Sequence, residues 1–162
     1  MKKTLISIAA LLIISLSLVG CDLINGFVAK NVGSTLAEKA DGEKTKYENA
    51  DIQYISNTDT SLTVKIKNNT ESTWQSGNMR DFWLEAQKDG EWYKVKQIGE
   101  FANTMELMIF APGQEMTHTF NFADRYGKLT PGTYRVVKSY WANATATAEA
   151  GEFHLVCEFT VE

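Results

Sequence analysis

The chain of 162 residues is poor in several residue types, and each shortage excludes a class of protein. Two cysteines and two histidines are too few ligands for a Cys/His zinc cluster, so no metal site is expected. Two prolines without a glycine period exclude a collagen-like chain. The formal net charge is −4, so the chain lacks the excess of basic residues that binds nucleic-acid phosphates, and no nucleic-acid partner is expected. The apolar content of 44% is nevertheless ordinary for a globular protein and argues against wholesale disorder.

Motifs of catalytic chemistry are also missing. The sequence contains no G-x-S-x-G nucleophile elbow, no Walker phosphate loop and no G-x-G-x-x-G dinucleotide fingerprint. Its serine, histidine and aspartate residues show no spacing that separates them from a chance combination. We therefore predict a protein that is not an enzyme, with no catalytic residues and no cofactor.

The first 20 residues have the layout of an export signal. Two lysines give a positive start, and the uncharged run that follows is slightly short of the ~20 apolar residues that cross a bilayer. The run ends in Leu18-Val19-Gly20-Cys21, which resembles the bacterial lipobox. The resemblance implies that the Cys21 sulfur receives a diacylglycerol and that cleavage then removes residues 1–20. The alternative is an ordinary signal peptide followed by a chance cysteine.

A lipid on Cys21 would hold the protein at the outer face of the cell membrane. Two acyl chains anchor stably where one is marginal, because each buried CH₂ contributes ~0.8 kcal/mol. Loss of residues 1–20 removes two lysines and no acids, which takes the formal charge from −4 to −6. An acidic body is not drawn to anionic headgroups, so the polypeptide should stand off the membrane. With Cys21 lipidated, Cys157 has no partner, and the fold must be stable without a disulfide.

Composition divides the remaining chain near residue 50. We assign residues 21–50 to a lipidated N-terminus and stalk, and residues 51–162 to a folded domain. Residues 38–49 are mostly charged or small and polar, which predicts a tether. Four apolar residues recur at i+4 spacing and predict a short amphipathic helix, with a flexible stalk as the alternative: Ile24, Val28, Val32 and Leu36.

Short alternating runs predict β-strands throughout residues 51–162. The clearest run places Leu62, Val64 and Ile66 on one face. Other alternating or β-rich runs occupy residues 82–85, 92–95, 116–122, 134–141 and 153–161. No long helix interrupts them. The pattern predicts an all-β fold, an antiparallel sandwich of about seven strands.

Turn signals separate these runs. Asp89-Gly90 predicts a tight hairpin, and Asn68-Asn69-Thr70 predicts a turn after the first run. Pro112-Gly113 and Pro131-Gly132 each suit a type II turn, because proline fixes φ at its second position and glycine tolerates positive φ at its third. Residues 142–150 are rich in alanine and threonine and predict a long mobile loop between the last two strands.

Residues 126–138 carry the clearest family resemblance. Their Leu-x-Pro-Gly-x-Tyr core, which ends at Tyr134, resembles the entry to a late strand of immunoglobulin-like sandwiches, where a tyrosine hydroxyl bonds back to upstream backbone. Phe82-Trp83-Leu84-Glu85 and Gly90-Glu91-Trp92-Tyr93 add to the likeness. Residues 60–162 together look like the bacterial Ig-like domain of Gram-positive surface lipoproteins. The resemblance implies that fold and a cell-surface setting, and it implies no catalytic residues.

Four aromatic residues are the candidates for ligand binding: Trp83, Trp92, Tyr93 and Trp141. If the neighbours of Trp83 face the core, strand alternation places its ring on the outer sheet face. Trp92 and Tyr93 point to opposite faces, so one of them should also face outward. Exposed rings can stack on cell-wall sugars or anchor a protein partner. The alternative is packing beneath the N-terminal segment or a loop.

The remaining candidates are predicted to be structural. His118 lies on the apolar face of its strand near several methionines, where core packing is favoured over a copper(I) site. His154 is expected to be solvated, and Cys157 to be a small buried hydrophobe. Asp81 and Glu85 lie about 13 Å apart at the rise of a strand, too far to act on one bond. Both are expected to be solvated surface charges.

Three functional hypotheses follow. The leading one is a lipid-anchored, non-enzymatic binding or accessory module whose partner is an unidentified surface protein or cell-wall component. The second is an inhibitor of secreted proteases that uses the loop at residues 142–150. The third is a cell-wall glycan binder that uses exposed aromatic rings such as Trp83.

Overall fold

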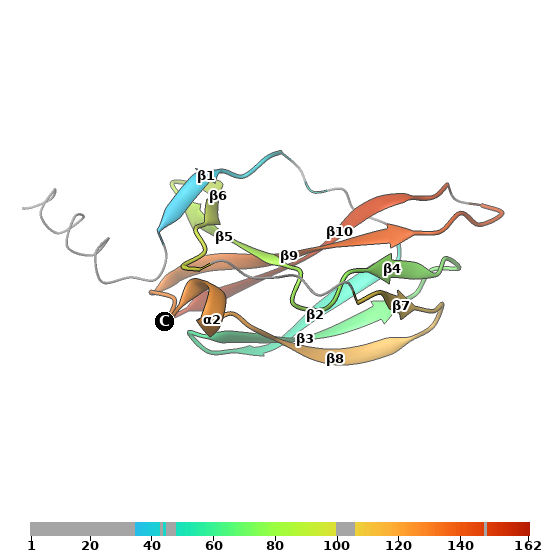
Figure 1. The fold of residues 1–162 in the computed structure, drawn as a ribbon, viewed down its shortest axis with the longest axis horizontal. Coiled ribbons are helices and arrows are strands. Elements are labelled where there is room, and N and C mark those ends of the chain that lie inside the picture. The colour runs from blue at the N-terminus through green and yellow to red at the C-terminus, as the bar shows by residue number, and fades with distance from the viewer. Residues whose placement is uncertain (1–34, 43, 45–47, 100–105, 148) are drawn as a thin grey trace, which may run out of the picture. The chain divides into compact units, whose positions relative to one another are not determined.

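The computed structural model describes residues 35–42, 44, 48–99, 106–147 and 149–162. These residues form ten strands in two antiparallel sheets and one helix of four residues (Figure 1), so the predicted all-β sandwich is confirmed. The predicted export signal, Cys21 and most of the predicted amphipathic helix lie outside the described residues.

The smaller sheet has the strand order β2-β3-β8, with β2 at Ala50–Asn57, β3 at Ser61–Asn68 and β8 at Glu115–Asn121. Its central strand, β3, alternates along its whole length between half-buried and buried residues. The apolar face of β3 is the predicted one, because Leu62, Val64 and Ile66 are fully buried. A strand buried on one face and partly open on the other is what strict alternation dictates.

The larger sheet has the order β1-β6-β5-β9-β4-β7, and β10 pairs with β9. β9 and β10 form a hairpin that is paired over 11 residues in each strand, from Gly132 and Val161 to Ala142 and Gly151. One side of β9 meets β10 and the other meets β5 and then β4, so β9 is the centre of the sheet. The bounds are β1 Leu36–Lys39, β4 Trp74–Ser76, β5 Trp83–Lys88, β6 Glu91–Val95, β7 Met108–Phe110, β9 Gly132–Ala142 and β10 Gly151–Val161.

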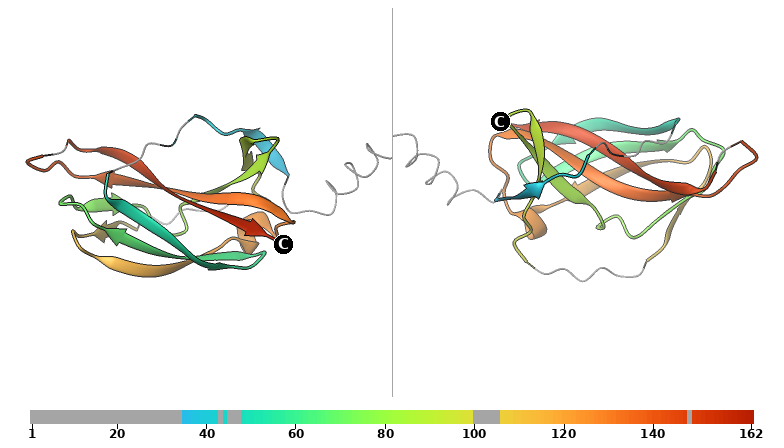
Figure 2. Two further views of the ribbon diagram at one scale, coloured as in Figure 1. Left: turned by 180° about the vertical axis from the view of Figure 1, so that it is seen from behind. Right: turned by 90° about the horizontal axis from the view of Figure 1, so that it is seen from above.

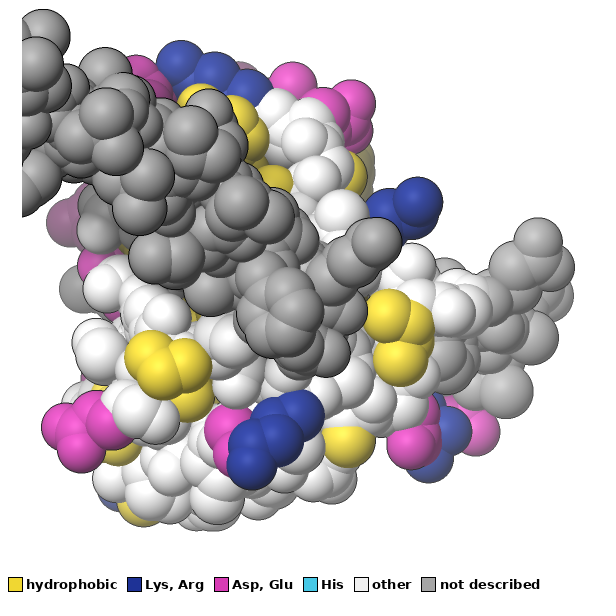
Figure 3. All heavy atoms as spheres, turned by 90° about the vertical axis from the view of Figure 1, so that its left-hand side faces the viewer, with side chains coloured by type: hydrophobic (Ala, Val, Ile, Leu, Met, Phe, Trp, Pro, Cys, Tyr) yellow, Lys and Arg dark blue, Asp and Glu magenta, His cyan; other side chains and the backbone are white. Residues whose placement is uncertain are grey.

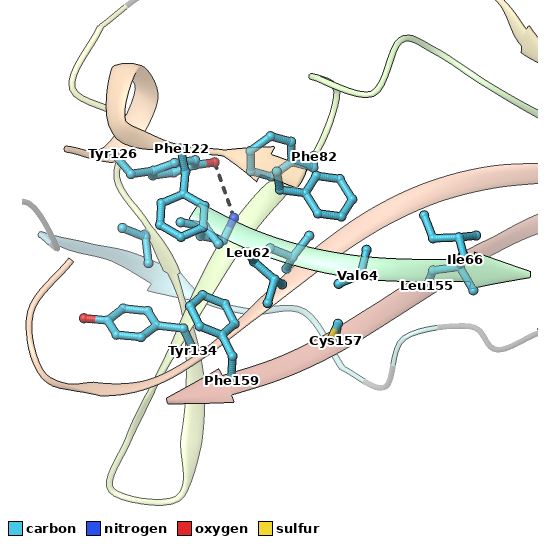
Figure 4. Close-up of a cluster of buried hydrophobic side chains, with 14 of the residues drawn as sticks. Leu62, Val64, Ile66, Phe82, Phe122, Tyr126, Tyr134, Leu155, Cys157 and Phe159 are labelled. Carbon is cyan, nitrogen blue, oxygen red and sulfur yellow. Dashed lines mark hydrogen bonds between the residues drawn. The ribbon is translucent and has the colours of Figure 1, made fainter. Parts of the chain in front are cut away.

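The hydrophobic core lies between the two sheets, which form separate layers in Figure 2. Side chains of β3 face those of β10, including Leu155, Cys157 and Phe159 (Figure 4). The short helix α2 (Ala123–Tyr126) closes one end of this space with Tyr126, whose hydroxyl accepts a hydrogen bond from the Leu84 N–H at 3.4 Å. The core therefore combines strands that are distant in sequence.

Four strands were not predicted from the sequence, namely β1, β2, β4 and β7. β4 and β7 have three residues each, too few for a period of two to be recognised. β1 corrects the interpretation of the stalk, because Leu36 pairs with Val95 and Lys39 with Tyr93 of β6. Residues 36–39 are therefore strand, where the sequence predicted helix at Leu36 and a tether from residue 38. β1 forms because the open edge of β6 supplies hydrogen-bond partners that its own sequence does not specify.

The structure confirms most of the predicted turns. Asp89 and Gly90 both have positive φ, 54° and 81°, as the tight β5–β6 hairpin requires. Gly113 has φ 76°, and the Gln114 N–H bonds to the Ala111 carbonyl, which makes the predicted type II turn. The type II turn predicted at Pro131-Gly132 is wrong, because Gly132 has no positive φ and already pairs with Val161 in β9.

The tyrosine that carried the family resemblance behaves as the resemblance implies. The Tyr134 hydroxyl donates a hydrogen bond of 2.9 Å to the carbonyl oxygen of Thr130, four residues upstream. Its ring stacks on Phe159 with 5.8 Å between the ring centroids. This bond ties the connection before β9 to the strand itself and is the tyrosine corner of immunoglobulin-like sandwiches.

One inward-facing position of β9 carries a charge. Lys138 is fully buried between Val136 and Tyr140 on the core face of the strand. Its Nζ donates to the backbone carbonyl oxygens of Asn78 and Asp81, each at 3.0 Å. Burial lowers the pKa of Lys138 to about 8, against the opposing influence of the Asp81 charge.

Replacing Lys138 with methionine should change how stability depends on pH. An unfolded lysine keeps its proton to a pH near 10.5, whereas folded Lys138 releases it near pH 8. The folded chain then binds fewer protons over that window, so the group makes the free energy of unfolding rise with pH by about 3 kcal/mol in total. Urea unfolding should show that the free energy of unfolding of wild type, relative to that of Lys138→Met, increases by this amount as the pH rises from about 8 to about 10.5. A constant difference between the two proteins would contradict the buried titration.

Candidate functional site

The outer face of the larger sheet, which points away from the core, carries an ordered set of aromatic and charged side chains. The strand register places Trp83 beside Val137, and places Glu85 between Arg135 of β9 and Lys94 of β6. Val137 is fully buried although it lies on this face and outside the core cluster. The outer face therefore holds a second, smaller packed layer. β10 adds His154, Val156 and Glu158 to the same face.

Glu85 is the centre of this layer, and its side chain is fully buried. Arg135 donates to Glu85 Oε2 from Nε at 2.7 Å and from Nη2 at 2.6 Å. Glu85 Oε1 accepts from the Trp83 Nε1–H at 2.8 Å and lies 2.9 Å from the Nζ of Lys44. Both carboxylate oxygens thus have charged or N–H partners, which is the condition for burying a carboxylate.

The prediction that Glu85 is a solvated surface charge is wrong, whereas Asp81 is exposed as expected. The reason is the register between β5 and β9, which sets Arg135 directly opposite Glu85. Burial by itself would raise the pKa of Glu85. Hydrogen bonds from Trp83, Lys44 and Arg135 outweigh that effect, and the pKa lies below its usual value. The group is therefore a carboxylate at neutral pH.

Two cations lie against the two outward-facing tryptophans. The Arg135 guanidinium lies over the Trp92 ring, with 4.2 Å from Cζ to the ring centroid. The Lys44 ammonium lies over the Trp83 ring at 5.6 Å. Such contacts contribute ~0.5–2 kcal/mol, more when solvent is excluded. The predicted outward orientation of Trp83 is confirmed, and Lys44 of the N-terminal segment covers part of its ring.

The structure separates the other two aromatic candidates from this cluster. Tyr93 points to the opposite face of β6 from Trp92 and pairs with Ala86. Trp141 lies on the outer face four residues beyond Val137, in register with Gln75 and Glu152, and is 50% exposed. Trp83 and Trp92 therefore form one site around Glu85, and Trp141 stands apart near the 142–150 loop. The described residues of that loop are mostly exposed, and inhibition through it stays a prediction.

His154 is half-buried and not solvated as predicted. Its ring meets the Trp83 ring edge-on, with 5.6 Å between centroids and an interplanar angle of 80°. Its Nδ1 is buried and has no hydrogen-bond partner among the residues that the structure describes. The prediction failed because alternation gives the face of a strand residue but not what covers that face.

Lys44 lies between two hollows of this surface. One is an open groove of about 830 Å³ that runs past Trp92 and Arg135. The other has about 570 Å³ and contains Trp83 and His154. Lys44 contributes to the wall of both. Figure 3 shows one end of the domain, where acidic and basic side chains are interspersed and the hydrophobic ones form separate spots.

The two remaining candidates of the sequence lie apart from the Glu85 cluster. His118 is half-buried beside Phe120, and burial together with the Lys138 charge lowers its pKa. Cys157 is buried as predicted, and burial, with the neighbouring Glu158 charge, raises the pKa of its thiol to about 11. Among the described residues, no group of three or more His, Cys, Asp or Glu side chains is placed to hold a metal ion. Neither residue takes part in the Glu85 cluster.

Sequence reasoning missed the residues that organise the site, namely Glu85, Arg135 and Lys44. Glu85 and Arg135 are 50 residues apart, and only the β5–β9 register brings them together. The available signal was strand alternation, which places Glu85 on the same face as Trp83. Lys44 gave no signal, because it sits in a polar segment without periodicity.

Comparison with known protein families identifies a match. A family model described as a bacterial Ig-like domain matches residues 44–154, more than half of the chain. Its first matched residue is Lys44, so β1 precedes the matched region. No curated protein is similar enough to the chain to be matched to it. Within the described ranges the structure has no helix that is long and apolar enough to cross a membrane.

Proposed function

Because the chain belongs to the bacterial Ig-like domain family, we propose that it is a lipid-anchored protein at the outer face of the cell membrane whose domain binds a partner. The family is generally non-catalytic, which supports an accessory role and not an enzymatic one. Cys21, the last residue of the lipobox-like sequence, is the proposed site of the lipid. The partner is a surface protein or a cell-wall component.

The observation that carries the binding proposal is the outer face of the larger sheet. Two tryptophans, Trp83 and Trp92, lie there outside the core cluster and are held around a buried carboxylate. Tryptophan and arginine are the residues most enriched at the energetic centres of protein interfaces. Open grooves run along both sides of the cluster, so its rings and charges are within reach of a ligand.

Replacement of Cys21 by serine should release the protein from the membrane. Serine cannot form the thioether to diacylglycerol. Because cleavage follows lipidation, the variant carries a lipid-independent, cleavable export signal in place of residues 1–20, so that its acidic polypeptide has neither acyl chains nor an apolar leader to hold it in the bilayer. Fractionation of cells should find wild type in the membrane pellet and Cys21→Ser in the soluble or secreted fraction. Cys157→Ser is the matched control and should stay in the pellet, because this thiol is buried in the core. A Cys21→Ser protein that stays in the pellet would refute the anchor.

Crosslinking of the tagged full-length protein in cells tests the binding role. We expect a dominant protein partner whose recovery falls at least about fivefold in Trp92→Ala, the loss that removal of an interface tryptophan produces. Leu107→Ala, at an exposed position outside the cluster, is the control and should leave recovery unchanged. Recovery of glycan fragments in place of a protein would favour the cell wall, with half-exposed Trp141 as the stacking ring. Recovery of neither would refute the binding role.

A further inference from the structure

The Glu85 cluster has the chemistry of a binding site for a positively charged group. Resting on the binding role proposed above, we infer that this pocket recognises a primary ammonium group and that a lysine side chain of a partner protein takes the place Lys44 now fills. The pocket would then be the specific part of the partner-binding face.

The occupied pocket shows what the site selects. The Lys44 ammonium lies 2.9 Å from Glu85 Oε1 and 5.6 Å from the centre of the Trp83 ring. A buried carboxylate beside the face of a tryptophan is the usual environment for recognising an alkylammonium group. His154 and Lys94 complete the walls of the hollow on the Trp83 side. The site therefore combines charge complementarity with an aromatic surface for the aliphatic stem.

Only one of the two cations on Glu85 is built into the sheet. Arg135 belongs to the central strand β9 and satisfies Oε2 with two N–H groups. Lys44 satisfies Oε1 from outside the two sheets, and its Nζ also donates to the Asp41 carbonyl oxygen at 3.0 Å. Asp41 is 94% exposed, and a Cβ added at Gly42 would meet no atom within 4 Å. The Ala40 N–H donates to the Trp92 carbonyl oxygen at 2.9 Å, just before this exposed pair of residues. Oε1 is thus the exchangeable half of the carboxylate.

The present occupant also indicates the class of the incoming one. Residues 39–42 and Lys44 form one wall of the groove beside Trp92, so a polypeptide that carries a lysine already lies along this surface. Its walls hold both signs of charge, with Glu91 and Glu158 near Lys39 and Arg135. A lysine-bearing protein segment matches this surface better than a neutral glycan does. An amine on a cell-wall stem peptide is the competing source, and the experiment separates the two.

The test uses the mature chain, residues 21–162 with Cys21→Ser, which carries neither the apolar leader nor the lipid, and Nα-acetyl-lysine methylamide as the probe. We expect Lys44→Ala to bind the probe, measured by tryptophan fluorescence, at least about tenfold more tightly than the protein with Lys44 present, because a tethered competitor has been removed. The uncharged analogue Nα-acetyl-norleucine methylamide should not bind. Lys65→Ala is the control, since Lys65 pairs with Glu115 on the other sheet, and it should not raise affinity.

A second variant separates recognition from folding. Trp83→Leu in the Lys44→Ala background keeps Glu85 and Arg135 together and should weaken probe binding at least about threefold, because the aromatic face is lost. Equal binding of the lysine and norleucine probes, or no gain in Lys44→Ala, would overturn the ammonium site. If an amine of a cell-wall stem peptide binds more tightly than lysine peptides do, the ammonium group does not come from a partner protein.

The outcome is separable from that of the proposed function. If the site is right, Lys44→Ala should capture more partner than wild type in cells, whereas a merely structural Lys44 would lower capture. A partner captured equally by both proteins overturns this inference and leaves the binding role intact. If the probe binds but no partner is recovered from cells, the proposed binding role and the inferred partner lysine are both wrong. The pocket would then still be an ammonium-binding site.

Discussion

Replacing Glu85 with glutamine should lower the free energy of unfolding by about 3–5 kcal/mol, the loss that follows removal of one partner from a buried ion pair. Glutamine keeps the shape of the side chain but leaves Arg135 and Lys44 as buried cations facing a neutral amide. The loss is large because the side chains of Lys44 and Arg135 are only 9% and 12% exposed, so water solvates the two cations poorly once the carboxylate is gone. Urea unfolding at neutral pH measures it.

Glu115→Gln is the matched control for this prediction. Glu115 forms an ion pair of 2.8 Å with Lys65, but the two side chains are 43% and 39% exposed. An exposed pair contributes only about 0–1 kcal/mol, so this variant should unfold almost as wild type does. If Glu85→Gln and Glu115→Gln lower the free energy of unfolding equally, burial of the Glu85 ion pair does not increase its contribution to stability.

The pH dependence of the Glu85 effect has a definite sign. The pKa of Glu85 is lowered in the folded protein, so its stabilising contribution is complete above the unfolded value near 4.5. The contribution is lost as the pH falls through the folded pKa. The difference between wild type and Glu85→Gln should therefore shrink in acid. A difference that grows below pH 4.5 would contradict the charged state assigned to Glu85.

Truncation of Trp74 to alanine should also cost about 3–5 kcal/mol, the range for removing a large aromatic side chain from a core. Trp74 is fully buried and contacts three rings, with centroid distances of 5.6 Å to Phe110, 5.8 Å to Tyr140 and 5.0 Å to Phe153. Its Nε1–H donates to the Thr70 hydroxyl at 3.1 Å, so alanine also removes a partly buried hydrogen bond. Thermal or urea unfolding measures the loss.

Trp141→Ala is the control for Trp74, because it removes the same side chain from a position that is 50% exposed on the outer face. Its loss should stay below about 1 kcal/mol, the usual range for surface substitutions. The comparison also bears on function, since a tryptophan that contributes little to stability is available for binding. Similar losses at both positions would mean that Trp141 is covered by part of the chain.

Local sequence determined the elements whose information lies within a few residues. Alternation fixed β3, β8 and β10, because one buried face selects one phase of a two-residue period, and β-rich composition marked β9. Asp89-Gly90 and Pro112-Gly113 fixed their turns through positive φ, which glycine adopts readily and aspartate tolerates better than most residues. Tyr134 marked the tyrosine corner for the same reason, since its hydroxyl reaches only four residues back.

Tertiary structure alone decided the composition of the site. Alternation placed Trp83 and Glu85 on the outer face, but it could not show that Arg135 arrives opposite Glu85 or that Lys44 returns to cover Trp83. Pairings between distant strands depend on the register of the whole sheet, which no local pattern contains. The same holds for β1, whose polar sequence becomes a strand only because β6 offers it an edge. Sequence thus determined which side chains face outward, and the assembled sheet determined which of them are buried, charged and paired.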